Sequence, residues 1–169
     1  MTVVSVAATT AQLDQVRELM RAFIAWHHQR HHEDLQLIDA YFDAAAFDAE
    51  LAALPGEYGA PRGCLLLAMH DGAAAGCVAL REIDVDACEM KRMFVYPQLH
   101  GLGVGRALAE EVIARARAVG YRSMRLDTGV RQGEAIALYR RQGFERIEPY
   151  YELPEALRNW LVFMELRLR

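Results

Sequence analysis

The chain has 169 residues, of which 53% are hydrophobic and 25% are charged. This composition is typical of one folded domain spanning residues 1–169 and argues against disorder. No apolar run reaches the roughly 18–20 residues of a membrane span, and a net charge of −4 argues against general nucleic-acid binding, so we expect neither partner. Three scattered cysteines and no visible secretory leader predict a cytoplasmic protein without disulfides.

The first third of the chain predicts one short strand and two helices. Residues 2–7 favour a strand, and a capping box that begins at Thr9 favours the start of a long helix. This helix runs into a histidine-rich end at residues 27–32. A second helix is expected over residues 40–54, because the Pro-Gly pair that follows stops it.

The rest of the chain alternates between strand and helix signals. An Asp-Gly turn joins the first two apolar runs as a hairpin. Short crossovers through helices imply a parallel pair of strands and a mixed sheet with helices on both faces. The expected strands are 64–70, 76–83, 88–96, 121–128, one that begins within 143–151, and 160–168; the expected helices are 104–119 and 133–142.

A glycine-rich loop with the sequence QLHGLGVGR connects a predicted strand to a predicted helix. Gly101, Gly103 and Gly105 allow a ligand to approach the backbone closely. The first amides of the helix have no intrahelical partner, and the helix dipole adds partial positive charge there. The loop therefore predicts a phosphate or pyrophosphate site, with added contacts from His100 and Arg106.

Two other phosphate-binding loops fit this segment less well. A P-loop needs a Lys-Ser/Thr pair after its last glycine, where this chain has Arg106 and Ala107. A dinucleotide fold gains support from Asp127, about 20 residues downstream, where a ribose-binding acid would lie. The glycine spacing GxGxG differs from GxGxxG, so a nucleotide-binding oxidoreductase is the lesser alternative.

Four neighbouring elements occur in the order and spacing of one known family. Residues 98–103 match the motif Gln/Arg-x-x-Gly-x-Gly/Ala, and KRMFVYP before them looks like that family's fourth strand. AIALY at 135–139, followed by a Gly-Phe pair, is similar to its later helix and strand start. The chain thus resembles the GNAT N-acetyltransferase superfamily. It departs from it where His100 replaces the usual arginine and Gln132 replaces a frequent asparagine.

The resemblance implies an α/β (mixed α+β) single domain with a mostly antiparallel central sheet, a splayed parallel strand pair and helices on both faces. It also implies acetyl-CoA as a co-substrate, no metal, a pyrophosphate on the loop amides, and pantetheine along β-strand backbone. The Val95 amide would donate to the oxyanion. The coenzyme would be bound by Met93, Phe94, Val95, Gln98, His100, Gly101, Leu102, Gly103, Val104, Gly105, Arg106 and Gln132.

The resemblance further implies two catalytic residues for direct transfer to an amine. Tyr139 lies at the family's general-acid tyrosine, and a phenol with a pKa of about 10 is protonated at neutral pH and can donate to a thiolate. Glu89 matches the base of some members, and its six-residue spacing from Val95 predicts that both face the same side of the strand. The alternatives are a core tyrosine, an ion-paired glutamate, and a water chain as base.

Histidines 27, 28, 31 and 32 form i, i+4 pairs, a spacing that can hold a metal. We favour a solvated helix end or a role beside the acceptor over a metal site.

The sequence thus predicts an acetyl-CoA-dependent N-acetyltransferase for a small-molecule, amino-acid or peptide amine. An acyl-CoA-binding regulatory module with little turnover is the main alternative. The apolar final strand over 160–168 is a candidate for pairing across a homodimer.

Overall fold

The computed structural model describes all 169 residues and contains one seven-stranded sheet in the order β1-β2-β3-β4-β5-β7-β6. Every neighbouring pair is antiparallel except β4 and β5, which confirms the predicted mixed, mostly antiparallel sheet. The strands are β1 (Thr2–Val6), β2 (Cys64–His70), β3 (Ala73–Glu82), β4 (Ala87–Val95), β5 (Ser123–Gly129), β6 (Glu145–Ile147) and β7 (Leu161–Arg167). The helices are α1 (Thr10–Arg30), α2 (Leu35–Tyr41), α3 (Ala44–Ala52), α4 (Val104–Val119), α5 (Gly133–Arg141) and α6 (Glu155–Trp160), with 3-10 turns at His32–Asp34, Gly56–Tyr58 and Pro97–Leu99.

The ends of the two longest helices follow from local chemistry. The Thr9 hydroxyl accepts from the Gln12 amide, and the Gln12 side chain accepts from the Thr9 amide, which completes the predicted capping box of α1. Gly103 and Gly120 flank α4 with φ of 85° and 107°, a left-handed conformation that glycine adopts without strain. The predicted bounds of this helix, 104–119, are confirmed.

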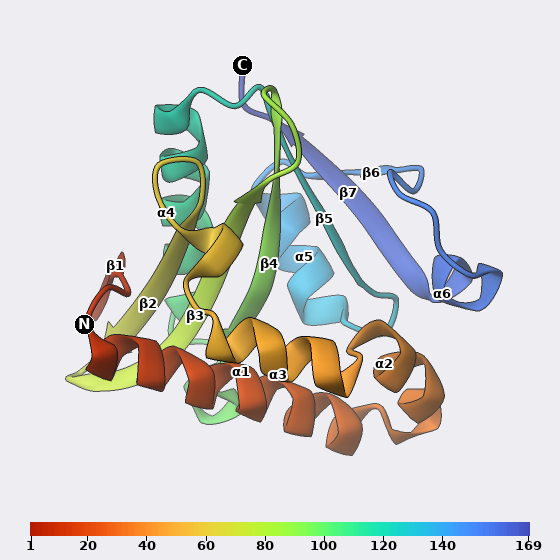
Figure 1. The fold of residues 1–169 in the computed structure, drawn as a ribbon, viewed down its shortest axis with the longest axis horizontal. Helices are drawn as coiled ribbons and strands as arrows, with labels where there is room; N and C mark the ends of the chain where they lie inside the picture. The colour runs from red at the N-terminus through yellow and green to blue at the C-terminus, as the bar shows by residue number, and fades with distance from the viewer.

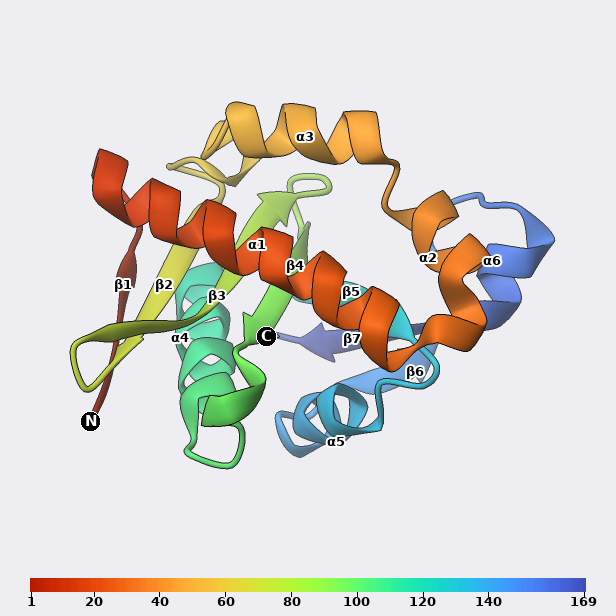
Figure 2. The same cartoon turned by 90° about the horizontal axis from the view of Figure 1, so that it is seen from below.

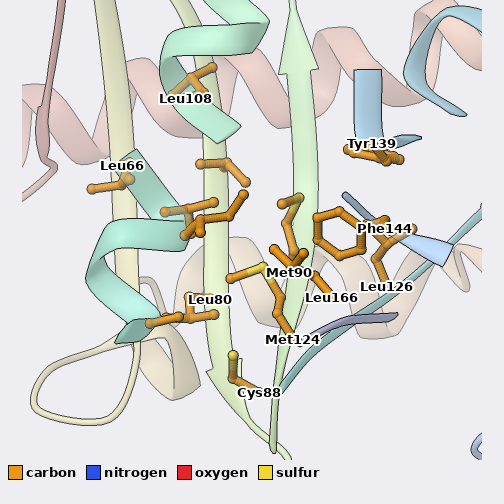
Figure 3. Packing of buried hydrophobic residues seen from close by; sticks show 14 of the residues in the cluster. Leu66, Leu80, Cys88, Met90, Leu108, Met124, Leu126, Tyr139, Phe144 and Leu166 are labelled. Carbon is orange, nitrogen blue, oxygen red and sulfur yellow. The ribbon is translucent and has the colours of Figure 1, made fainter. Parts of the chain in front are cut away.

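Helices cover both faces of the sheet: α4 and α5 lie on one face, and α1 and α3 lie on the other (Figures 1 and 2). Under α4, Leu66 and Met90 of the sheet pack with Leu108 in the larger core (Figure 3). Under α1 and α3, Leu19 and Leu51 pack in a second core. Burial of these apolar side chains holds the layers together, at roughly 25 cal/mol per Å² of surface removed from water.

The two parallel strands pair only where they begin. Ala87–Glu89 pairs with Ser123–Arg125, and the strands then separate toward α1 (Figure 1). A bulge adds one residue to β4 opposite β3, and Arg92 within it has φ of 58°, which is rare for a residue other than glycine. The gap between β4 and β5 is therefore the predicted splay, and it leaves the second half of β4 without a strand neighbour on that side.

Two predicted elements differ from the structure. The helix expected over 40–54 is two helices, because Asp43 leaves helical geometry and its carboxylate accepts from the Ala46 amide to cap α3. Helix α6 gave no sequence signal, because six residues are too few to show a helical period. No helix combines the length and the hydropathy needed to cross a bilayer.

The final strand has a strand neighbour on each side. β7 pairs with β5 along its whole length, and β6 covers its other edge at residues 163–165. A homodimer stays a prediction.

Candidate active site

The glycine-rich loop lies where β4 ends and α4 begins. Gly101 and Gly103 have φ of 83° and 85°, and open space surrounds the position of an added Cβ at both. No amide of residues 101–106 donates to a backbone carbonyl, and the first bond of α4 runs from the Ala107 amide to the Gly103 carbonyl. These free amides lie at the positive end of the helix dipole, so they form a site for an anion.

A groove borders this loop, the end of β4, and the facing sides of α1 and α5. Ten of the twelve predicted coenzyme-binding residues line it; Gln98 and Leu102 do not. Positive charge suited to an anionic ligand comes from arginines on three helices and on the turn between β5 and α5. The lining arginines are Arg30, Arg106, Arg131 and Arg141. Only Arg106 carried a sequence signal, because the other three lie far from the glycine motif along the chain.

His100 holds the end of β4 in place. Its Nε2 lies 2.9 Å from the Val95 carbonyl oxygen and donates to it, while Nδ1 lies 3.7 Å from Glu134. The Tyr96 amide donates to Ala75 on β3, so alternation along the strand turns the Val95 amide toward the gap between β4 and β5. His100 therefore contacts the strand that carries the predicted oxyanion donor.

A small inner chamber of about 50 Å³ lies between the separated strands. Met93 and Gln132 border both the chamber and the groove, so the two cavities adjoin. On its other side, the chamber shares Tyr41, Glu89 and Lys91 with an outer cavity between α2, β4 and the β6–α6 connection. The chamber thus separates the groove, on one side, from a second opening to solvent.

Tyr139 of α5 lines the inner chamber at the edge of the larger core (Figure 3). Its hydroxyl makes no hydrogen bond with the protein. Burial and the nearby Asp127 carboxylate raise the pKa of Tyr139 above its usual value of about 10. The phenol is therefore protonated at neutral pH, with its proton free for a group that enters the chamber.

Glu89 is only 2% exposed, and both of its carboxylate oxygens are occupied. Oε1 accepts from Arg81 Nε at 2.7 Å, and Oε2 accepts from the Tyr150 hydroxyl. The prediction that Glu89 and Val95 share a face of β4 is wrong, because the bulge reverses the alternation between them. Val95 packs with Met90 under α4, whereas Glu89 lies on the opposite face. The role of Glu89 as a base stays a prediction.

Asp127, near the end of β5, is the second carboxylate of the inner chamber. It accepts from the Tyr41 hydroxyl and, at 2.6 Å, from the Tyr151 hydroxyl, and no cationic side chain lies within ion-pair distance of it. Burial raises the pKa of Asp127, although the two tyrosine hydrogen bonds oppose this shift. Tyr41 and Tyr151 carried no sequence signal, because they reach Asp127 from separate elements.

The four clustered histidines fall into two kinds. His27 is buried, and burial together with His31 and His28 lowers the pKa of His27 to about 4, so its ring is neutral at pH 7. Its Nε2 lies 3.3 Å from the amide nitrogen of Gln132. His31 is also buried and borders the groove. His32 is largely exposed, and His28 is partly exposed with its Nε2 2.7 Å from Asp39. The structure contains no group of three or more side chains arranged to hold a metal.

Comparisons with known proteins point to one family. A family model described as "Acetyltransferase (GNAT) family" matches residues 14–144. An uncharacterized N-acetyltransferase of Schizosaccharomyces pombe is 42% identical over 109 residues, which cover 63% of this chain and 67% of that protein. A GNAT-family acetyltransferase from Staphylococcus aureus superposes with a TM-score of 0.77 at 18% identity over 100% of both chains. The PaiA N-acetyltransferase of Thermoplasma acidophilum, solved with coenzyme A, superposes with a TM-score of 0.71 at 15% identity over 99% of both chains. The two solved structures share the fold of this chain.

Proposed function

Because the chain belongs to the GNAT family of acetyltransferases, we propose that it transfers an acetyl group from acetyl-CoA to a primary amine of a small molecule, amino acid or peptide. The observation that carries this proposal is the junction of two cavities. The groove offers the free amides of residues 101–106, and the adjoining chamber offers the free hydroxyl of Tyr139. Acetyl-CoA carries a thioester at one end and a diphosphate further along the molecule. An anion site and a proton donor at opposite ends of one path therefore suit this molecule.

Each end of this path has a task in the transfer. The loop amides bind the diphosphate, and the Val95 amide, turned to the gap, donates to the oxyanion as the amine attacks the thioester carbonyl. A carbon–nitrogen bond then forms and the carbon–sulfur bond breaks. Tyr139 gives its proton to the thiolate as the carbon–sulfur bond breaks, and the phenolate then regains a proton from solvent. Because a phenol with a pKa above 10 is a weaker acid than a thiol with a pKa near 8.5, this transfer requires the two groups to be held close together.

The amine must also lose a proton, and two buried carboxylates are candidates for accepting it. Glu89 is the base predicted from the sequence, but both of its carboxylate oxygens already accept hydrogen bonds, from Arg81 and from the Tyr150 hydroxyl. Asp127 has no cationic partner, its pKa is raised by burial, and it borders the same chamber as Tyr139. We therefore place the proton-accepting role on Asp127 and keep Glu89 as the second candidate.

Binding and turnover test the proposed function separately. Calorimetry should detect binding of acetyl-CoA and none of NADH, and a thiol-release assay should respond only when a suitable amine is added from a panel. Binding of acetyl-CoA without thiol release for any amine would favour an acyl-CoA-binding module. Absence of acetyl-CoA binding would refute the assignment of the groove.

A further inference from the structure

Lys91 is the single lysine of the chain, and it lies on β4 between the inner chamber and the outer cavity. Its side chain is only 18% exposed. Because it borders both spaces, it lies on the path by which a molecule from the outer cavity would reach Tyr139.

The other charged side chains around Lys91 already have close partners. Arg92 forms a bidentate salt bridge with Glu50, in which its Nε and Nη2 donate to the two carboxylate oxygens at 2.8 and 2.9 Å. Arg81 binds Glu89 at 2.7 Å and also contacts Glu57 at 3.2 Å.

The ammonium of Lys91 has no such partner. The nearest carboxylate oxygen, Oε1 of Glu89, lies 3.9 Å from its Nζ, beyond hydrogen-bonding distance, and that oxygen already accepts from Arg81. Lys91 makes no hydrogen bond with the protein. Its three N–H donors are therefore available to a molecule in the two cavities that Lys91 borders.

The surrounding charges indicate what kind of acceptor is missing. Arg81 pairs with both Glu57 and Glu89, and Arg92 pairs with Glu50, so Lys91 is the cation at this opening that no carboxylate contacts at hydrogen-bonding distance. Burial and the neighbouring Arg92 lower the pKa of Lys91, and an anion bound beside it would reverse that effect. Asp127, which accepts hydrogen bonds from two tyrosines and contacts no cation, lines the same chamber. A molecule with both an amine and an anionic group matches this pair of charges.

We propose that Lys91 binds a carboxylate of the acceptor, so that the enzyme selects amines that also carry a carboxylate, such as amino acids. This inference rests on the proposed function and narrows its acceptor class. The acceptor enters from the outer cavity, its carboxylate stops at Lys91, and its amine reaches the chamber from the side opposite the coenzyme groove.

The test compares matched acceptors on matched variants. Each amino acid in a small panel is paired with its amide, and kcat/KM is measured for both on the wild type, on Lys91→Met and on Arg122→Met. Arg122 is the control, because its side chain is 73% exposed and pairs only with Asp86 at 3.4 Å. We expect the acid-to-amide ratio to fall roughly 10- to 100-fold in Lys91→Met and to stay unchanged in Arg122→Met. Comparing ratios between proteins cancels the different basicities of the two amines.

A second measurement does not depend on the variant folding. Protein labelled with 13C at lysine Cε gives a signal from one residue, since the chain has a single lysine. In the presence of coenzyme A, the preferred amino acid should shift this signal and its amide should not. An equal response to both compounds, an unchanged acid-to-amide ratio in Lys91→Met, or transfer of an acetyl group onto Lys91 itself would overturn the proposal.

Failure of this inference and failure of the proposed function look different. If amines are acetylated without any preference for a carboxylate, only the role of Lys91 is refuted. If no amine is acetylated, the proposed function fails first.

Discussion

Individual side chains determine which hydroxyl groups of the inner chamber already have a hydrogen-bond acceptor. Tyr139 is buried without a hydrogen-bond partner, whereas Tyr41 and Tyr151 both donate to Asp127. Burial therefore keeps the Tyr139 phenol neutral and leaves its proton uncommitted, while the other two phenols hold a carboxylate in place. The chemistry of the site depends on which hydroxyl is free.

Replacing Tyr139 by Phe should lower kcat by roughly 100-fold while acetyl-CoA affinity stays near the wild-type value, because only the proton for the departing thiolate is lost. Steady-state kinetics and calorimetry measure the two quantities. Tyr121→Phe is the matched control, since the Tyr121 hydroxyl donates to the Arg62 carbonyl away from the chamber. It should cost about 1 kcal/mol of stability and leave kcat unchanged. Unchanged kcat in Tyr139→Phe would remove this tyrosine from the mechanism.

Asp127→Asn and Glu89→Gln should differ in their pH profiles. If Asp127 accepts the proton, kcat/KM of the wild type rises as pH increases through the raised pKa of Asp127. Asp127→Asn should lose this rising limb of the pH profile, and its kcat/KM should fall roughly 100-fold. Glu89→Gln should keep the limb and lose stability, because Arg81 loses its closest charged partner. The opposite pattern would return the role of base to Glu89.

At the scale of elements, the site depends on places where regular structure is interrupted. The bulge at Arg92 turns the second half of β4, and Glu50 of α3 holds the Arg92 guanidinium from the opposite layer. The break between α2 and α3 at Asp43 brings Tyr41 to the chamber and Glu50 to the bulge. These two irregular segments complete the chamber around Tyr139 and Asp127, which the regular elements α5 and β5 carry.

The loop before α4 permits a test with a matched glycine. Gly103→Ala and Gly72→Ala each place an L side chain at a left-handed φ, 85° and 86°, with no atom within 4 Å of the added Cβ. Both should cost about 1–2 kcal/mol of stability for the same reason. Only Gly103→Ala should also weaken acetyl-CoA binding, by roughly 10-fold, because it disturbs the amides that hold the anion. Equal coenzyme affinities in calorimetry would contradict the anion site.

At the scale of the whole molecule, α1 links the second core to the groove and the inner chamber. Its middle packs through Leu19 against the sheet, and its end carries His27 to the inner chamber. His27 stays neutral there among aromatic rings of Phe23 and Phe42. Protonation of one buried ring would thus disturb both the packing of the layers and the floor of the site.

This burial predicts acid sensitivity. The pKa of His27 is lowered from 6.5 to about 4, so between these values the unfolded chain binds a proton that the folded chain does not. The free energy of unfolding therefore does not depend on His27 above pH 6.5. It decreases as pH falls toward 4, by at most about 3 kcal/mol. Urea unfolding across this range should show a shallower pH dependence for His27→Phe. The exposed His32→Gln should follow the wild type, and an equal slope in His27→Phe would contradict the assignment.

Much of the architecture followed from short-range patterns. The capping box at Thr9, the apolar stripe of α4 and the glycines before it depend only on nearby residues, so sequence was enough to place them. Contiguous motifs also selected Tyr139, which lines the chamber, and ten of the twelve predicted coenzyme-binding residues that line the groove; their roles stay predictions. Periodicity and capping act over a few residues, which is why they can be interpreted without coordinates.

The tertiary structure alone decided which polar groups have partners. The six-residue spacing of Glu89 and Val95 predicted one face of a regular strand, and a single bulge reversed it. Asp127 between two tyrosines, and Lys91 without a hydrogen bond, result from elements that are distant in sequence and meet around one chamber. Burial and ion pairing depend on how distant elements pack. A local sequence pattern therefore does not predict whether a charged side chain has a partner within the protein.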